Sequence, residues 1–250
     1  NSGEKEENSK WSRLLYSQCT DFIKDLDFIY FAENYNNMGS LKELSSAGNT
    51  HAKELIERID DLIDKEEKIV SETDFSILYD RKRNLFRVGY NVSANSPDNS
   101  YYDLLASEAR LTSFLAIAKG DVPQRHWFKL GRPLTLIHGK PVLISWSGTM
   151  FEYLLPNLFM KVFPGTMLDQ TCKMAVRMQI KYGKDKKVPW GISESGFYRF
   201  DQQLNYQYRA FGVPGLGFKS DLGKSLVISP YATMLAISIA PQEAVKNIKT

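Results

Sequence analysis

Apolar residues recur every three or four positions in two long N-terminal stretches, and this spacing limits the fold more than any other feature of the sequence. Charged and polar residues fill the positions between them, a pattern typical of amphipathic helices. The apolar positions are Trp11, Leu14, Leu15, Phe22, Leu26 and Ile29 in the first stretch, and Leu55, Ile56, Ile59, Leu62, Ile63 and Ile69 in the second. We therefore expect an N-terminal helical arm over residues 1–72.

After Thr73 the apolar period changes to two, which is typical of β-strands. Apolar residues alternate on either side of a polar turn at 80–84, so we expect a β-hairpin there. A second hairpin is expected at 127–145, with its turn at 138–140. Further helices are expected at about 101–118, 150–162, 167–182, 202–211 and 231–239. Residues 73–250 should thus form a mainly helical domain with short β-hairpin inserts.

Helix-capping signals support several of these helices. A Ser or Thr followed three residues later by an acid resembles a capping box, while Pro in the first turn or Gly after the last turn marks a helix end. The capping pairs are Ser100 with Asp103, Thr149 with Glu152 and Thr166 with Asp169; Ser229 precedes Pro230; and Gly120, Gly183 and Gly212 follow expected helices.

Charge and composition exclude several classes of function. The 250 residues are 43% hydrophobic, as in ordinary globular proteins, and 32 basic against 29 acidic residues give a net charge of only +3. Because Lys and Arg are scattered, we expect no nucleic-acid partner. Cys19 and Cys172 are far apart and no histidine lies in a metal-binding motif, so we expect no metal or other cofactor. No apolar run approaches the roughly 20 residues of a membrane span, and we expect this segment to be soluble.

Glu194 is the acidic residue that helix and strand patterns explain least. It lies in a segment, 188–197, that also contains Trp190, Phe197 and two glycines. A carboxyl group among aromatic side chains loses hydration, and its pKa rises toward the range in which it can donate a proton. We therefore expect Glu194 to have a functional role.

Three other acids near aromatic residues are weaker candidates. Asp103 and Glu152 each occupy the third position of an expected helix, where capping explains an acid well. Glu108 is expected two turns into the helix that begins at Tyr101, in a segment with few polar residues. Its ordinary explanation is an exposed ion pair with Arg110 or another cation.

The aromatic residues around these acids suit a carbohydrate ligand. Sugar rings present C–H faces that pack on aromatic planes, and their hydroxyls bind planar polar side chains. Simple core packing is the alternative for some of these aromatics. The aromatic candidates are Tyr101, Tyr102, Trp146, Tyr153, Trp190, Phe197, Tyr206 and Tyr208, and the polar ones are Asn205, Gln207, Arg209 and Arg110.

Several sequence strings carry a family resemblance. They include Trp-Ser-Gly-Thr-Met-Phe-Glu-Tyr at 146–153 and Pro-Trp-Gly-Ile-Ser-Glu-Ser-Gly at 189–196, and others lie at 84–91, 100–110, 116–123 and 204–214. Together, in collinear order over about residues 70–248, they resemble the cyclisation (glycoamylase-like, transglycosylase) region of bacterial cyclic β-1,2-glucan synthases.

The resemblance implies an (α/α)6 barrel related to β-1,2-glucanases. It also implies a place within a long membrane-associated synthase, on the cytoplasmic side of the bacterial inner membrane, beside a glycosyltransferase and a phosphorylase-like region. Such a barrel needs about twice as many helices as we expect after the first hairpin. We therefore expect residues 73–250 to hold about the first half of the barrel, and the rest of the barrel and synthase to be its partners.

The resemblance further implies a reaction and the residues that carry it. It implies retaining transglycosylation that closes linear β-1,2-glucan into a ring, with Glu194 and Glu108 as catalytic pair and Glu152 in reserve. Glu194 is assigned as nucleophile and Glu108 as acid/base, with the reverse order open, and a retaining pair stands roughly 5–5.5 Å apart. The implied substrate-binding residues are Tyr101, Tyr102, Asp103, Arg110, Trp146, Tyr153, Trp190, Ser193, Tyr206, Gln207 and Tyr208.

Transfer without hydrolysis requires walls that bind the acceptor sugar and exclude water, for which Trp146, Tyr153 and Trp190 are the candidates. Two other functions fit the same sequence. One is a plain endo-β-1,2-glucanase, which would activate water instead of a sugar hydroxyl. The other is a noncatalytic glucan-binding module of a larger synthase.

Overall fold

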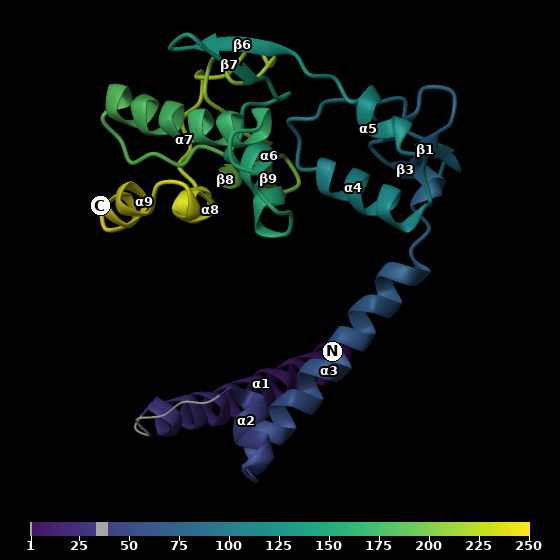
Figure 1. Cartoon of the computed structure of the whole chain (residues 1–250), viewed down its shortest axis with the longest axis vertical. Coiled ribbons are helices and arrows are strands. Elements are labelled where there is room, and N and C mark those ends of the chain that lie inside the picture. Colours follow the sequence, from purple (N-terminus) through teal and green to yellow (C-terminus); the bar gives the residue numbers. More distant parts are fainter. Residues whose placement is uncertain (1, 34–39) are drawn as a thin grey trace. The chain divides into compact units, whose positions relative to one another are not determined.

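The structure is a computed structural model that describes residues 2–33 and 40–250, with side chains described for 8–28 and from 40 onward (Figure 1). Its contacts divide the chain into two units, with the division after Thr73. Helices account for most of the regular structure in the described residues, so the mainly helical class is confirmed.

The first unit holds three helices, α1 (Ser2–Glu33), α2 (Leu41–Ser46) and α3 (Thr50–Glu72). Helix α2 begins with a capping box, in which the Ser40 amide donates to the Glu43 carboxylate at 2.6 Å. An ion pair of 3.0 Å between Arg58 and Asp25 connects α3 to α1. Most apolar residues of the two predicted helical patterns are exposed, and the side chain of Ile29 lies outside the described residues.

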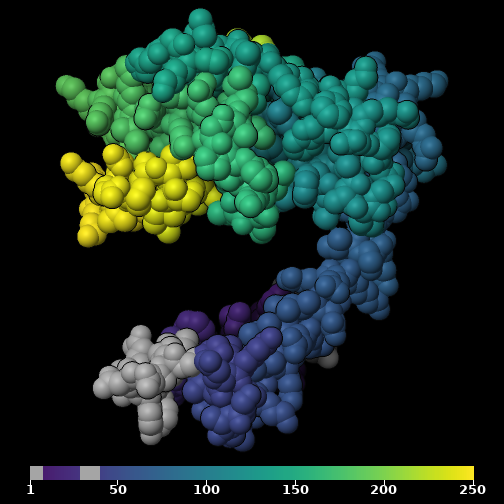
Figure 2. Space-filling view, viewed as in Figure 1, coloured from purple at the N-terminus to yellow at the C-terminus, as the bar shows by residue number. Residues whose placement is uncertain are grey.

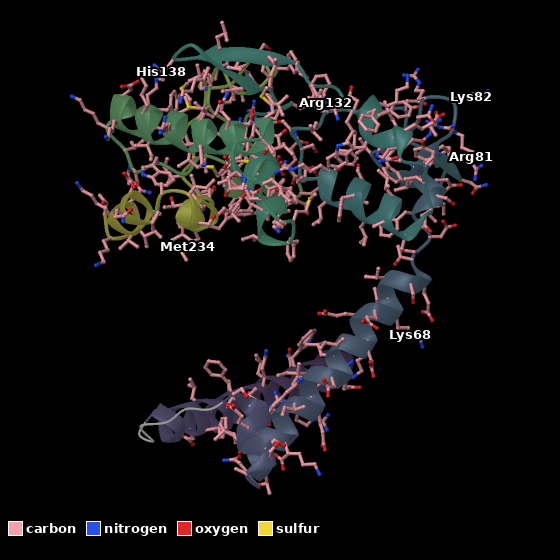
Figure 3. All side chains as sticks on the ribbon, viewed as in Figure 1. Lys68, Arg81, Lys82, Arg132, His138 and Met234 are labelled. Carbon is pink, nitrogen blue, oxygen red and sulfur yellow. The ribbon has the colours of Figure 1, made fainter. Side chains whose placement is uncertain are left out.

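The second unit begins with a three-stranded antiparallel sheet of order β1-β2-β5, formed by β1 (Tyr79–Asp80), β2 (Leu85–Arg87) and β5 (Tyr101–Tyr102). The predicted turn at 80–84 joins β1 to β2, and Arg81 and Lys82 project from it (Figure 3). Residues Phe75–Leu78 form the 3-10 helix η1 instead of the predicted strand, because the Asp74 carboxylate accepts from the Ser76 amide. Strands β3 (Tyr90–Asn91) and β4 (Ser96–Pro97) form a short ladder beyond β2.

The second predicted hairpin is confirmed as β6 (Leu134–Ile137) paired with β7 (Lys140–Leu143). His138 and Gly139 form its two-residue turn, with φ of 48° and 73°. Positive φ at both central positions matches the right-handed twist of a hairpin.

Helix α7 (Met167–Lys186) is the central helix of the second unit, and it confirms the helix predicted at 167–182. It packs against β7 and against α6 (Met150–Leu154), which continues as the 3-10 helix η2 (Leu155–Leu158). The last helices of the second unit are α8 (Pro230–Leu235), η3 (Ala236–Ser238) and α9 (Pro241–Ile248). The yellow C-terminal segment lies directly against the green one in Figure 2.

The helix predicted at 101–118 begins only at α4 (Arg110–Lys119), and α5 (Arg125–Lys129) follows it. Residues 101–102 belong to β5, and Leu104 forms a bridge with Gly131, so the predicted capping pair of Ser100 and Asp103 is wrong. The predicted stop at Gly120 is confirmed, with φ of 85°.

The helix predicted at 202–211 is wrong. Residues Tyr206–Ala210 form strand β9, which pairs antiparallel with β8 (Glu194–Phe200). Gly212 therefore follows a strand, not a helix. Gly183 lies inside α7, whose last turn ends at Lys187 in the left-handed conformation.

Two glycine-containing segments dock backbone to backbone beside the core. The Ser145 amide donates to the Leu216 carbonyl at 3.1 Å, and the Phe218 amide donates back to the Ser145 carbonyl at 3.1 Å. A Cβ atom at Gly212 would overlap the Ser147 carbonyl oxygen, and one at Gly217 would lie 2.5 Å from the Gly148 nitrogen. The glycine string at 212–217 is thus more than the simple turn that its composition suggests.

Replacing Gly212 with Ala should lower the free energy of unfolding by about 3 kcal/mol or more, because the new methyl group must displace a backbone carbonyl. Gly215 is the matched control, since a Cβ there meets nothing within 4 Å and only its φ of 88° is unfavourable. Gly215→Ala should cost about 1–2 kcal/mol. Denaturant unfolding of both variants tests this, and equal losses would contradict the docking argument.

Candidate active site

The Glu152 carboxylate is buried at the start of α6 and is fully bound by donors of its own chain. It accepts from the Ser147 amide at 3.0 Å, the Thr149 amide at 2.8 Å and the Ser145 hydroxyl at 2.9 Å. Thr149 completes the predicted capping box by accepting from the Glu152 amide. Burial raises the pKa of Glu152, and these hydrogen bonds oppose the rise. The capping explanation of Glu152 is therefore confirmed, and its carboxylate organises the 145–149 loop.

Tyr153 lies in the core and is not a wall of a sugar site. Its hydroxyl donates to the Leu216 carbonyl at 2.6 Å and accepts from the Ser145 amide at 3.1 Å. It is 1% exposed, which contradicts its predicted contact with substrate. Tyr153 instead joins the two docked backbone segments.

Glu194 is the first residue of β8 and lies on the same face of the β8–β9 hairpin as Tyr208. Gly196 is directly opposite Tyr208, so Glu194 and Tyr208 are diagonal neighbours, and the Tyr208 hydroxyl donates to the Glu194 carboxylate at 2.8 Å. Partial burial raises the pKa of Tyr208, and the bond to Glu194 raises it further. This donor fixes one carboxylate oxygen of Glu194.

Glu108 lies just before α4, not inside a helix as predicted. Burial raises the pKa of its carboxyl group, and the charges of Glu152 and Glu194 add to the rise. Ser107 donates to it through a hydroxyl at 3.2 Å. Glu108 and Glu194 thus come from different segments, and they lie close enough for the Glu194 charge to raise the pKa of Glu108.

Tyr102 lies beside this pair, whereas Tyr101 does not. Burial raises the pKa of Tyr102, and the charges of Glu108 and Glu194 raise it further. Successive residues of a strand face opposite sides, and the Tyr101 hydroxyl donates to Asp80 at 2.8 Å on the other side of β5. The structure therefore places the Tyr101 hydroxyl away from Glu108 and Glu194, and its predicted contact with substrate stays a prediction.

Trp146 has an exposed aromatic ring that contacts Asp103 and Phe218. Its indole N–H donates to Asp103 at 2.7 Å, and its ring lies 5.6 Å from that of Phe218. About half of each ring is exposed, at 52% for Trp146 and 49% for Phe218. Asp103 therefore orients a sugar-sized platform, a role that replaces the predicted helix cap.

Three further predicted site residues are buried and contact other parts of the fold. The buried Arg110 guanidinium donates to the carbonyls of Ser107, Glu152 and Tyr153. Trp190 is 6% exposed and packs in the core, so it cannot form the predicted acceptor wall. Ser193 is buried and accepts from the Phe151 amide at 3.0 Å.

Gln207 and Tyr206 lie on β9, where the Gln207 amide donates to the Asn205 carbonyl. Gln207 is directly opposite Phe197, on the other face of the hairpin from Glu194. The predicted substrate contact of Gln207 at the carboxylates is therefore not supported by its placement. Tyr206 shares the Glu194 face.

Two residues near the carboxylates were missed by sequence reasoning. The Tyr231 hydroxyl, from α8, donates to the Glu194 carbonyl and to the Ser193 hydroxyl, both at 2.8 Å. Burial lowers the pKa of Lys219, whose ammonium interacts with the charges of Arg209, Glu152 and Glu194. The glycine string before Lys219 was the available signal, because close backbone approach needs glycine.

Among the described residues, no group of three or more His, Cys, Asp and Glu side chains is placed to hold a metal ion. None of the helices in the described part of the chain is long and apolar enough to cross a membrane.

Comparison with known proteins places these residues in a family context. The family model Glycoamylase, described as "Putative glucoamylase", matches residues 100–250. The chain is 49% identical over 242 residues, or 97% of its length, to the "Cyclic beta-(1,2)-glucan synthase NdvB" of Rhizobium meliloti (strain 1021). It spans 8% of the length of that synthase.

Among solved structures, the chain is similar to a "putative glucoamylase" from Bacteroides caccae ATCC 43185, with a TM-score of 0.49 and 16% identity. That likeness covers 81% of this chain and 50% of the other.

The different surroundings of Glu152 and Glu108 predict opposite effects on stability. Glu152→Gln should lower the free energy of unfolding by about 2–3 kcal/mol, because an amide NH2 would face backbone N–H donors. Glu108→Gln should raise it by about 0.5–1 kcal/mol near pH 8, because a buried charge is removed.

The pH dependence follows from the raised pKa of Glu108. The contribution of Glu108 to the free energy of unfolding is fully present below the pKa that its carboxyl group has in the unfolded chain. It is lost as the pH rises through the higher pKa of the folded protein. The advantage of Glu108→Gln should therefore grow from pH 5 to pH 8 in denaturant unfolding. A constant difference across this range would contradict the burial argument.

Proposed function

The chain belongs to the Glycoamylase family, and on that premise we propose that it closes linear β-1,2-glucan into cyclic β-1,2-glucan as a retaining transglycosylase. The observation that carries the proposal is the meeting of Glu108 and Glu194 beside Tyr102, with burial raising the pKa of Glu108. The 49% identity to a cyclic β-1,2-glucan synthase supports the choice of glucan.

The proposed reaction has two displacements at the same anomeric carbon. One carboxylate attacks C1 to form a glycosyl-enzyme ester, while the other carboxyl protonates the leaving glycosidic oxygen. The 2-hydroxyl at the far end of the bound glucan then attacks C1. Its proton passes to the carboxylate that had acted as the acid, and the carboxylate that had attacked C1 is released. Configuration is retained and no water is consumed.

Glu108 and Glu194 are proposed to act as a pair. The raised pKa of Glu108 supports the acid/base role for Glu108, with Glu194 as nucleophile. The bond that Tyr208 donates to Glu194 supports the same order, because it orients the Glu194 carboxylate. Glu152 is left out of the chemistry, since three internal donors already bind its carboxylate.

We propose further that the second unit is part of an (α/α)6 barrel, completed by other helices of a membrane-associated synthase with its barrel on the cytoplasmic side. Exposed apolar side chains on α8, η3 and α9 support such a partner. They include Met234, which projects from α8 (Figure 3), together with Ile237, Val245 and Ile248. The first unit, over residues 1–72, is proposed to be a helical arm outside the barrel.

The test is incubation of the protein that contains this chain with linear β-1,2-glucan and no sugar nucleotide, followed by mass spectrometry. Cyclic products are one water lighter than linear chains of the same length. They should form with the wild-type protein and be lost, by at least about 1000-fold, in Glu108→Gln and Glu194→Gln.

Other outcomes identify the two rival functions. Shortened linear products with new reducing ends would establish a hydrolase. Binding of glucan without any change in its mass, in wild type and both variants, would establish a noncatalytic binding module. Normal cyclisation by both variants would contradict the proposed pair.

Trp146→Ala should raise the ratio of hydrolysis to transfer several-fold, because it removes the platform that the acceptor sugar needs to outcompete water. This residue takes the role predicted for the buried Trp190. Phe128→Ala is the matched control, since Phe128 is 68% exposed on α5. Linear and cyclic products are quantified together, and an unchanged ratio in Trp146→Ala would remove Trp146 from the acceptor site.

A further inference from the structure

Four aromatic residues lie along the β8–β9 hairpin beyond Glu194. Tyr208 contacts the Glu194 carboxylate, and the Tyr206 ring covers Gly196, where a Cβ would lie 2.7 Å from it. The Phe200 ring follows at 5.6 Å from Tyr206 between centroids. Tyr198 ends the row at 5.5 Å from Phe200.

The strand register places the rings of Tyr208, Tyr206 and Phe200 on the face of Glu194, and Tyr198 joins them through its ring contact with Phe200. Glu194, Gly196 and Tyr208 lie on one face, Tyr206 is two residues from Tyr208 on β9, and Phe200 is directly opposite Tyr206. The register shift between Phe197 and Phe200 returns β8 to this face after two extra residues. The seven residues of β8 span roughly 20 Å, which is long enough for several sugar rings.

The row is exposed although its members are aromatic. Tyr198 is 89% exposed, Tyr208 66% and Tyr206 58%. The opposite face of the hairpin is anchored, since the Phe197 ring packs edge-on against buried Phe211 at 5.3 Å. The hairpin therefore uses one face for the core and presents the other to a ligand.

The tip of the hairpin is held in place by Asp201. Its carboxylate accepts from the amides of Gln203 and Asn205, each at 2.9 Å, and from the Asn205 side chain at 3.1 Å. These bonds lower the pKa of Asp201. A loop fixed by its own side chain keeps the rings of both strands in register, which reduces the entropy lost when a ligand binds.

We propose that Tyr208, Tyr206, Phe200 and Tyr198 form a track that binds the glucan chain beyond the carboxylate pair and so makes binding depend on chain length. This inference rests on the proposed function for the identity of the ligand. A glucan is the occupant because the row starts at Tyr208, which binds the Glu194 carboxylate of the site, and extends along the same hairpin. The tyrosine hydroxyls and ring faces together match the hydroxyls and C–H faces of sugar rings.

The test measures the affinity of linear β-1,2-glucans of increasing length for the full protein carrying Glu108→Gln, which prevents turnover. A second protein adds Tyr198→Ala and Phe200→Ala. Affinity should rise with length in the first protein. In the second, the longest chains should lose about tenfold or more in affinity, whereas the shortest chains should lose much less.

Two further variants keep the test decisive. Tyr198→Phe with Phe200→Tyr retains both rings and should restore the length dependence, while Phe128→Ala, in an exposed ring of α5, should leave it intact. If the alanine variant has a lower thermal midpoint but unchanged length dependence, another part of the protein covers this face of the hairpin. That result would overturn the track. An equal loss of affinity at all lengths would also overturn it.

The outcome is separable from that of the proposed function. Cyclisation by the wild-type protein together with length-independent binding would leave the function standing and remove the track. Length-dependent binding that needs both rings, without cyclic product from the wild type, would establish the track and remove the transglycosylase.

Discussion

The buried Glu152 carboxylate is the constraint on which the site depends. Three donors from the 145–149 loop bind it, and the capping box that includes it starts α6. A loop held by a carboxylate in the core has one conformation, because each broken bond would leave a buried charge without a donor. That conformation exposes the Ser145 carbonyl and amide to the neighbouring 211–219 segment, and it turns Trp146 outward.

Glycine residues allow the 145–149 loop to pack closely against the 211–219 segment. Gly148, Gly212 and Gly217 let two backbones approach where any Cβ would collide, and reciprocal hydrogen bonds join Ser145 to residues on both sides of Gly217. The same segment then delivers Phe218 to the ring of Trp146 and Lys219 to the neighbourhood of the carboxylates. The packing of the 145–149 loop therefore also determines which side chains of the 211–219 segment reach the site.

The sequence predicted elements whose signals are local. Helix α7 has a helical apolar period and a Thr166 cap, and the β6–β7 turn has residues that tolerate positive φ. Residues 206–210 were predicted as a helix because their pairing partner, 194–200, cannot be recognised from either segment alone. Glu194 was predicted from its aromatic, glycine-containing segment and Glu108 from the family strings. The burial of Tyr153 and Trp190 was not predicted, because by composition an aromatic residue suits a core and a sugar site equally well.

Three glutamates of the second unit, Glu108, Glu152 and Glu194, differ in how many donors each one meets, and this difference suits them to different roles. Glu152 has three donors and no access, which suits a structural anion. Glu194 has one phenol donor on an open hairpin face, so one oxygen stays available to a substrate. Glu108 is partly buried and accepts from the Ser107 hydroxyl and from its own backbone N–H, and burial raises the pKa of its carboxyl group. Donors supplied so unequally give chemically identical side chains different surroundings, and the proposed acid–base chemistry at a glycosidic bond requires carboxyl groups with different surroundings.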